Sequence, residues 1–218
     1  MRQIIAGGYA PAFYSHASRY GAPMRCLVVL AHPVTHSLSH AIAETAVDAI
    51  ERNGHDYRLI DLYQSGFDPR LTVSEREGYY RKFDQSMLAS EIGDLQWAEA
   101  LVLIFPTWWF GPPAILKGWF DRVWAPGIAY DHAGDLGAIK PRLGGLRKVV
   151  AITTLGSPWW VDYFVLRRPV RNVLKHAVLR CCAPHARLTF ISLYKAERID
   201  ARTASDWMAR VKKAISGL

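Results

Sequence analysis

Short apolar runs alternate with helix-like segments from residue 24 almost to the end of the chain. The runs have the length of buried strands and cover 25–31, 57–62, 100–105, 147–153 and 186–194. The segments that follow them predict helices over 39–52, 87–99, 112–124, 163–180 and 202–216. A polar stretch, 64–86, is expected to be irregular. Because the apolar runs are nearly continuous, they predict strands covered on both faces, in a parallel sheet between two layers of helices.

Five strands joined by helices favour a three-layer α/β fold with a doubly wound parallel sheet. The flavodoxin-like strand order 2-1-3-4-5 fits this number of strands, and its crossovers are right-handed. In such sheets ligands bind outside the carboxyl ends of the strands, where the strand order reverses between the first and third strands. The segments that follow residues 31, 105 and 153 are therefore the first places to look for a site.

The length of 218 residues, with half of them hydrophobic, suits one domain with a full core. The formal net charge of +8 is spread along the chain, without a zinc-finger, RNP-type or basic-zipper pattern, and this disfavours nucleic-acid binding. A positive surplus of this size suits a protein that attracts anionic cofactors.

Residues 1–23 show no sustained period, so we expect an N-terminal extension, with the folded domain over 24–218. The sequence has no apolar run of membrane-spanning length and no clear signal-peptide pattern, so neither membrane insertion nor secretion is expected. The cysteines, at positions 26, 181 and 182, form no C-x-x-C pair and fit a reducing cytoplasm.

The segment after the first strand carries hydroxyl groups just before a helix. It contains neither a G-x-G-x-x-G nor a G-x-x-x-x-G-K pattern, so the two common nucleotide loops are absent. Ser37 and Ser39 can instead donate to phosphate oxygens, His32 can add a donor, and the start of the helix offers free N–H groups. The alternative is that Ser39 is only the N-cap of the helix.

The segment after the third strand is rich in aromatic rings. Four of the nine residues in 105–113 (FPTWWFGPP) are aromatic, and a loop cannot normally bury so many rings. Large exposed apolar groups usually mark a binding surface, and a flat heteroaromatic ring system is a natural partner for them. Trp108 and Trp109 can equally belong to a subunit interface, and the two interpretations are compatible.

These residues carry a family resemblance. The run 106–111 (PTWWFG), followed by 113–123 (PAILKGWFDRV), resembles the signature of the NAD(P)H:quinone oxidoreductases, which include DT-diaphorase, the modulator-of-drug-activity quinone reductases and the ancillary reductases of potassium-efflux systems. His32 with 37–39 is similar to the family's phosphate loop, 129–132 (AYDH) to its Ala-Tyr-x-(Tyr/His) segment, and 152–157 to its Thr-Thr-Gly-Gly loop. The resemblance covers about residues 24 to 215.

The resemblance implies a homodimer with a flavin at its interface and NAD(P)H as the electron donor. FMN is favoured over FAD because the chain from Met24 is short and has no obvious addition for an adenine. The positions that the resemblance assigns to the flavin are His32, Ser37, Leu38, Ser39, Pro106, Thr107, Trp108, Trp109, Phe110, Thr153, Thr154, Leu155 and Gly156. Tyr130 and His132 correspond to residues that line the acceptor pocket from the second subunit.

Two departures from the family pattern concern the segment after the fourth strand. Leu155 replaces a glycine, and its side chain could hinder close approach of a ligand to the backbone. A Tyr and a His of the family are also missing from 157–163 (SPWWVDY). Tyr163 is the nearest candidate for a catalytic role, with a core or interface tyrosine as the alternative. His132 is the other acid–base candidate, and a plain surface histidine is its alternative.

The sequence therefore predicts a flavin-dependent NAD(P)H:quinone oxidoreductase, with ping-pong transfer of hydride to the flavin and then to a small quinone-like acceptor. The alternatives are a flavodoxin-type electron carrier and a regulatory flavoprotein subunit of a membrane transporter. Neither G-x-S-x-G nor H-E-x-x-H occurs, so neither a hydrolase nor a metal site is expected.

Overall fold

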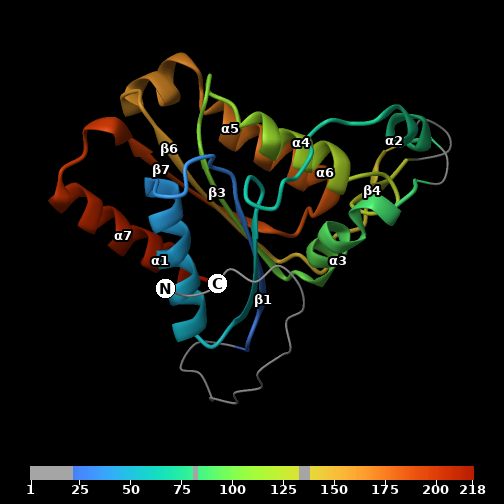
Figure 1. Cartoon of the computed structure of the whole chain (residues 1–218), viewed down its shortest axis with the longest axis horizontal. Helices are drawn as coiled ribbons and strands as arrows, with labels where there is room; N and C mark the ends of the chain where they lie inside the picture. Colours follow the sequence, from blue (N-terminus) through green and yellow to red (C-terminus); the bar gives the residue numbers. More distant parts are fainter. Residues whose placement is uncertain (1–21, 81–82, 133–137) are drawn as a thin grey trace.

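Parallel strands form the central sheet of the protein (Figure 1). The structure is a computed structural model, which describes residues 22–80, 83–132 and 138–218. The sheet has five strands in the order β2-β1-β3-β6-β7. They are β1 (Arg25–Leu30), β2 (Asp56–Asp61), β3 (Ala100–Pro106), β6 (Lys148–Leu155) and β7 (Arg187–Tyr194). The predicted fourth and fifth strands correspond to β6 and β7, so this order is compatible with 2-1-3-4-5. The expected extension 1–23 lies outside the described residues apart from its last two.

Two further strands, β4 (Tyr130–Asp131) and β5 (Lys140–Pro141), lie outside the main sheet. They pair with each other as a short antiparallel hairpin. This hairpin could not be predicted from the sequence, because each of its strands has only two residues and neither has an apolar pattern.

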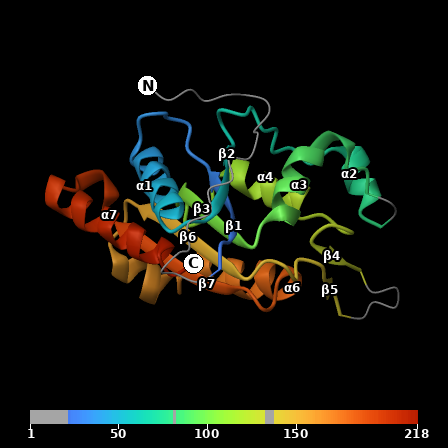
Figure 2. The ribbon, with the colours of Figure 1, turned by 90° about the horizontal axis from the view of Figure 1, so that it is seen from below.

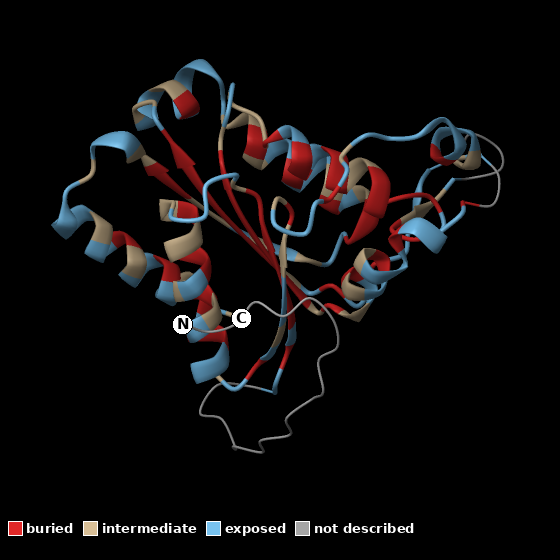
Figure 3. Ribbon diagram, in the orientation of Figure 1, coloured by how far each residue is buried: buried red, intermediate tan, exposed pale blue. Residues whose placement is uncertain are grey.

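The apolar runs behave as continuous buried strands. All of β3 is buried, as is β1 apart from Arg25, whereas the edge strands β2 and β7 are partly exposed. Figure 3 shows the same contrast, with buried strands at the centre of the molecule. A parallel sheet covered on both faces requires this pattern, because no face of its central strands meets water.

Helices cover both faces of the sheet (Figures 1 and 2). On one face, Val28 and Leu30 pack in a core with α1 (Leu38–Arg52) and α7 (Ala201–Ile215). On the other, Leu27 and Val29 pack with α3 (Ala89–Trp97), α4 (Ala114–Val123) and η3 (Val173–Leu179), which α6 (Arg180–Cys182) continues. Within the described ranges, no helix has the length and apolar character needed to cross a membrane.

The predicted helix over 163–180 is wrong as a single element. A π-helical turn, η2 (Val161–Val165), is followed by Arg167 and Arg168, both in the left-handed conformation with φ of 56°. Only then does α5 (Pro169–Asn172) begin and lead into η3. The cause is Pro169, because the ring of a proline disfavours the right-handed helical conformation in the residue before it.

The stretch 64–86 was predicted to be irregular, but part of it is helical. It contains α2 (Val73–Gly78) and the start of η1 (Ser86–Leu88). Thr72 and Glu75 form a capping box at the start of α2, a pattern that the sequence shows as T-x-x-E. Glu75 also forms a buried ion pair with Arg122 of α4, with 2.6 Å between Oε1 and Nη2. Arg122 donates a further hydrogen bond to the carbonyl oxygen of Asp68, and together these contacts hold the stretch against α4.

Gly118 of α4 provides a test of this packing. A Cβ atom at position 118 would lie 2.5 Å from the Cα of Pro69 and closer still to its carbonyl oxygen. We therefore expect Gly118→Ala to destabilise the protein by about 1–3 kcal/mol, as overpacking does. Gly93→Ala in α3 is the control, because no atom beyond its chain neighbours and its own helix backbone lies within 4 Å of its Cβ position. It should stabilise the protein by about 0.5–1 kcal/mol through helix propensity. Urea unfolding measures both, and equal effects would contradict the packing described.

Candidate functional site

The carboxyl ends of β1, β3 and β6 bring the three predicted segments to one edge of the sheet. The N–H of Thr107 donates to the carbonyl oxygen of Thr154 at 2.8 Å, and the hydroxyls of Thr107 and Thr153 lie 2.5 Å apart. The rings of His32 and Trp108 have centroids 6.5 Å apart. Residues far apart in the sequence thus meet where the strand order reverses.

Ser37 is the N-cap of α1, and its Oγ accepts a hydrogen bond from the N–H of His40. The interpretation of Ser39 as the N-cap is wrong, because Ser39 lies inside the first turn and is only 2% exposed. Leu38 is the first helical residue and is half-buried. Ser37 is therefore the better placed of the two serines for an anion at the helix N-terminus.

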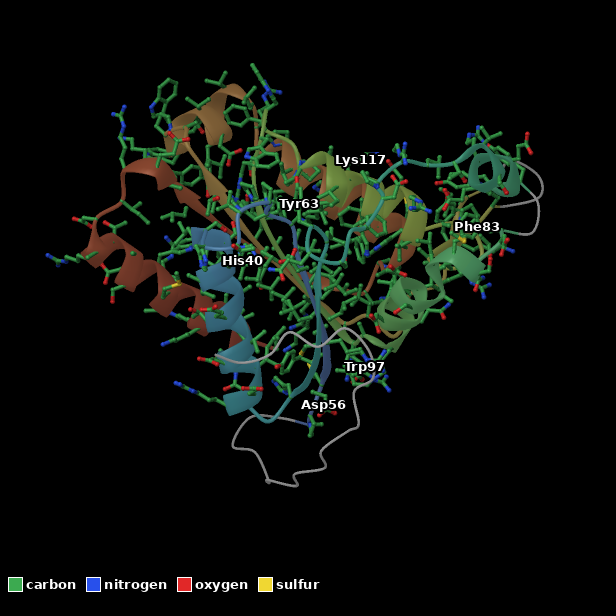
Figure 4. The ribbon with its side chains drawn as sticks, viewed as in Figure 1. His40, Asp56, Tyr63, Phe83, Trp97 and Lys117 are labelled. Carbon is green, nitrogen blue, oxygen red and sulfur yellow. The ribbon has the colours of Figure 1, made fainter. Side chains whose placement is uncertain are left out.

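Behind Ser37 lies a hydrogen-bond chain that the sequence analysis missed. His40 Nε2 lies 3.0 Å from Asp61 Oδ2 at the end of β2, and His40 Nδ1 lies 2.9 Å from Ser37 Oγ. Figure 4 labels His40 on α1. A carboxylate only accepts, so Nε2 carries the proton in this pair, which orients the ring toward Ser37. Nearby, burial lowers the pKa of His32, whose Nδ1 contacts the backbone of Val34.

The segment after β3 makes a tight turn over 108–111. Trp108 and Gly111 exchange backbone hydrogen bonds of 3.0 and 2.9 Å, and Trp109 and Phe110 both have positive φ, of 50° and 55°. Left-handed conformations are costly for such residues and cluster at functional sites. The turn leaves the ring of Trp109 fully exposed and that of Trp108 43% exposed. The aromatic residues are therefore presented to solvent, as binding of a ring system or of a second subunit requires.

The third segment begins later than predicted. Thr153, Thr154 and Leu155 are the last residues of β6 and pair with β7, so the loop starts at Gly156. The side chain of Leu155 is buried and lines the space between the sheet and α5. Gly156 is exposed and lies against Glu197, whose Oε1 would be 3.3 Å from a Cβ at that position.

A small cavity of about 10 Å³ lies beneath these strand ends, enough for about one water molecule. Its lining comes from several segments and consists of Thr107, Thr153, Leu155, Asp162, Arg168, Val170, Arg171, Phe190 and Ser192. The buried carboxylate of Asp162 accepts a hydrogen bond of 2.7 Å from the Tyr194 hydroxyl. Within the described part of the chain, Arg168 Nε has no hydrogen-bond partner.

Tyr163 lies beside this cluster and is not one of the residues that line the cavity. Its ring stacks against the guanidinium of Arg168, with 4.4 Å from Cζ to the ring centroid. The ring is 41% exposed and also meets Trp159 edge-on. The contact that the structure gives Tyr163 is thus with Arg168.

The structure does not bring Tyr130 and His132 to this edge within one chain. They belong to the β4 region, which Figures 1 and 2 place at the far end of the molecule from α1. His132 stacks on Tyr80, with ring centroids 5.0 Å apart, and meets Tyr130 edge-on at 5.3 Å. Their assignment to a second subunit's site stays a prediction.

Comparison with known proteins identifies the family. The model of the family described as having a flavodoxin-like fold matches residues 24–214. The chain belongs to this family. The matched range contains Ser37, the 108–111 turn and the end of β6.

Within the family, the relatives agree with the resemblance to quinone oxidoreductases. NAD(P)H dehydrogenase (quinone) 1 of Cavia porcellus is 34% identical over 152 residues, which cover 61% of this chain and 54% of that protein. The ribosyldihydronicotinamide dehydrogenase-like protein traD of Penicillium crustosum is 30% identical over 72% of this chain and 68% of its own length. This chain thus aligns with about half the length of the Cavia porcellus protein.

A solved structure is similar to this chain over the whole fold. The NAD(P)H:quinone oxidoreductase from Methanothermobacter marburgensis superposes with a TM-score of 0.78 at 26% identity. The match covers 90% of this chain and 97% of that structure. The similarity therefore extends well beyond the 106–123 signature.

The raised pKa of Tyr194 predicts that the folded state loses stability at alkaline pH. Burial, followed by the hydrogen bond to Asp162, raises the pKa of Tyr194 from 10.0 to about 12. The folded state therefore holds this proton more tightly than the unfolded state, so stability is unaffected below about pH 10 and falls as the pH rises toward 12. Tyr194→Phe should make that fall shallower. Urea unfolding across this range measures both proteins, and identical slopes would show that the Tyr194 pKa is not raised.

Proposed function

We propose that this protein is a flavin-dependent oxidoreductase that accepts hydride from NAD(P)H and passes it to a small quinone-like molecule. The observation that carries the proposal is the strained, exposed turn over 108–111 at the switch point of a doubly wound sheet. The names of the quinone oxidoreductase relatives support the same activity.

The residues present fit the two chemically different ends of a flavin. At one end, the N-terminus of α1, which Ser37 caps, offers free N–H groups and a partial positive charge to a phosphate. At the other, Trp109 offers an exposed aromatic face, and Arg168 Nε is a buried polar atom that lacks a partner among the described residues. A phosphate-bearing heteroaromatic group needs donors and apolar surface in this combination.

When bound, a flavin accepts hydride from a nicotinamide and donates it to a quinone. The chain's own contribution is to bind and orient. In this proposal the 108–111 turn holds the ring through its backbone and the Trp109 face, and the backbone at Thr154 to Gly156 meets the opposite edge of the ring. Donor and acceptor would use the same exposed face in turn, which gives ping-pong kinetics. The proposed cofactor is FMN, with FAD as the alternative.

The proposed site is completed by a second copy of the chain. The exposed rings of Trp108 and Trp109 give a second copy an apolar surface to pack on. Tyr130 and His132 of that copy would then line the acceptor pocket, with His132 as a candidate to supply a proton to the quinone oxygen. This arrangement accounts for their distance from the strand ends within one chain.

The proposal is tested on the purified full-length protein. We expect it to bind flavin, to be bleached by NADH or NADPH, and to oxidise NAD(P)H when menadione is present. Mass spectrometry of the released flavin distinguishes FMN from FAD. Protein that fails to bind either flavin would refute the proposal. Reversible bleaching without menadione turnover would instead indicate an electron carrier or a regulatory subunit.

Trp109 supplies a more local test. Trp109→Ala should weaken flavin binding about threefold to tenfold, because stacking of aromatic rings contributes about 0.5–1.5 kcal/mol. Trp97→Ala is the control, since Trp97 ends α3 just before β3 begins, at the opposite edge of the sheet, where it packs under Arg58 (Figure 4). Fluorescence titration with FMN measures both, and equal affinity in the two variants would remove the stacking role of Trp109.

A further inference from the structure

The segment that follows β6 exposes a continuous group of apolar side chains. Six of the eight residues in 159–166 are large, apolar or aromatic, and exposed to solvent. They are Trp159, Trp160, Tyr163, Phe164, Val165 and Leu166, and we call them the 159–166 patch. Phe164 is 70% exposed and Val165 60%. Single exposed hydrophobic residues are ordinary on a protein surface, whereas a contiguous group of them marks a surface that binds something.

Contacts within the segment hold the patch together. The ring of Trp159 meets those of Tyr163 and Phe164 edge-on, with centroids 6.0 and 5.6 Å apart. Between the exposed residues, the carboxylate of Asp162 is buried and accepts a hydrogen bond from the hydroxyl of Tyr194 on β7. The rings are therefore exposed on a segment that is tethered to the sheet, so less conformational entropy is lost when a partner covers them.

Positive charge is concentrated in the same part of the chain. Residues 156–195 contain seven Lys and Arg residues and one acidic residue, Asp162, so they carry +6 of the formal net charge of +8. Just outside this range, Glu197 lies against Gly156. Arg167, which directly follows the patch, and Lys175 of η3 are both exposed. The seven cations, none of which forms a salt bridge with a residue that the structure describes, are Arg167, Arg168, Arg171, Lys175, Arg180, Arg187 and Lys195.

The combination of rings, aliphatic side chains and cations discriminates between partners. A second copy in symmetric contact presents the same surface to itself, so the Arg167 side chains of the two copies would approach and repel each other. A single-stranded nucleic acid uses rings and cations, but the aliphatic side chains of Val165 and Leu166 have no counterpart in it. A bilayer with anionic lipids accommodates all three kinds of group. Aliphatic side chains enter its acyl boundary, Trp and Tyr rings lie at the level of the headgroups, and cations stay near the phosphates.

We propose that the 159–166 patch, together with the cations that follow it, docks the protein onto the surface of a membrane that contains anionic lipids. The docking is peripheral, because no helix among the described residues could span a membrane. Apolar burial and the attraction of cations to the headgroups act together, as in other proteins that lie on a bilayer surface. This inference goes beyond the proposed function and does not depend on it, since the patch binds lipid whether or not a flavin is present.

The test measures sedimentation of the full-length protein with lipid vesicles. One set of vesicles contains phosphatidylcholine alone, and the other contains phosphatidylcholine with phosphatidylglycerol. We expect the protein to sediment with the anionic vesicles, and to do so less at high salt, because salt screens exposed charges. Protein that binds the anionic vesicles no better than the neutral ones would overturn the proposal.

Substitution of the patch tests its apolar part. Phe164→Ser combined with Val165→Ser should weaken binding to the anionic vesicles about tenfold or more, because two apolar side chains no longer leave water. The matched control is Val73→Ser combined with Met87→Ser, at positions of α2 and η1 that are 76% and 83% exposed. The control should bind as the wild-type protein does. Equal losses in the two double variants would show that the patch is not the docking surface.

A second pair of substitutions tests the cations and keeps the proposal testable should the first pair not fold. Arg167→Gln combined with Lys175→Gln should weaken binding about fivefold for each charge removed. Lys212→Gln combined with Lys213→Gln removes two exposed charges from α7 and should change binding far less. If both pairs weaken binding equally, net charge alone attracts the protein to the lipid, and the proposed surface is wrong.

Two further measurements separate this inference from its alternatives. Sedimentation velocity without vesicles should give the Phe164→Ser, Val165→Ser variant the oligomeric state of the wild-type protein. A change in that state would make the patch an interface between copies and overturn the docking proposal. Fluorescence titration with FMN reports on the proposed function separately. Protein that binds FMN but not anionic vesicles would refute only the docking, and protein that binds the vesicles but no flavin would refute only the proposed function.

Discussion

The parallel pairing of β1, β3 and β6 is the constraint on which the candidate site depends. In a parallel sheet every strand ends at the same edge, and the register here pairs Leu30 with Ile104 and Ile104 with Ile152. Burial of these strands on both faces holds that register, because a slip of one residue would exchange the two packed faces. The loop before α1, the 108–111 turn and the end of β6 converge for this reason, although more than a hundred residues of sequence separate the first from the last.

A rigid sheet also explains where the strained backbone is tolerated. Positive φ occurs in non-glycine residues at Trp109 and Phe110 after β3, at Arg167 and Arg168 between η2 and α5, and at Lys195 directly after β7. Each such residue costs about 1–3 kcal/mol, so it persists only where fixed neighbours leave no alternative. The hydrogen bonds from Thr107 to Thr154 and from Arg168 to Asp162 supply such neighbours. The strained residues thus lie in the segments that follow the carboxyl ends of the strands.

Much of the fold could be predicted from the sequence, because short apolar runs that alternate with helical segments are compatible with few arrangements besides a buried parallel sheet. The exceptions depend on single residues or on tertiary contacts. Pro169 breaks the helix over 163–180 through its effect on Arg168, and the capping box at Thr72 forms a helix in a stretch dominated by polar residues. Ser37 and Ser39 both precede apolar helical residues, so spacing alone could not decide which of them is the cap. The contact of His40 with Asp61 joins α1 to β2, which no local pattern reveals.

In the candidate site, too, the parts built from consecutive residues could be predicted, and the part built by tertiary contacts could not. The first two segments carry their chemistry within a few consecutive residues, so hydroxyls before a helix and a cluster of rings could be recognised directly. The third draws Asp162 and Arg168 from the segment after β6, Ser192 and Tyr194 from β7, and Thr107 from the end of β3. From the local order of residues alone, Tyr163 is the nearest candidate for a catalytic role. In the folded protein that tyrosine stacks on Arg168.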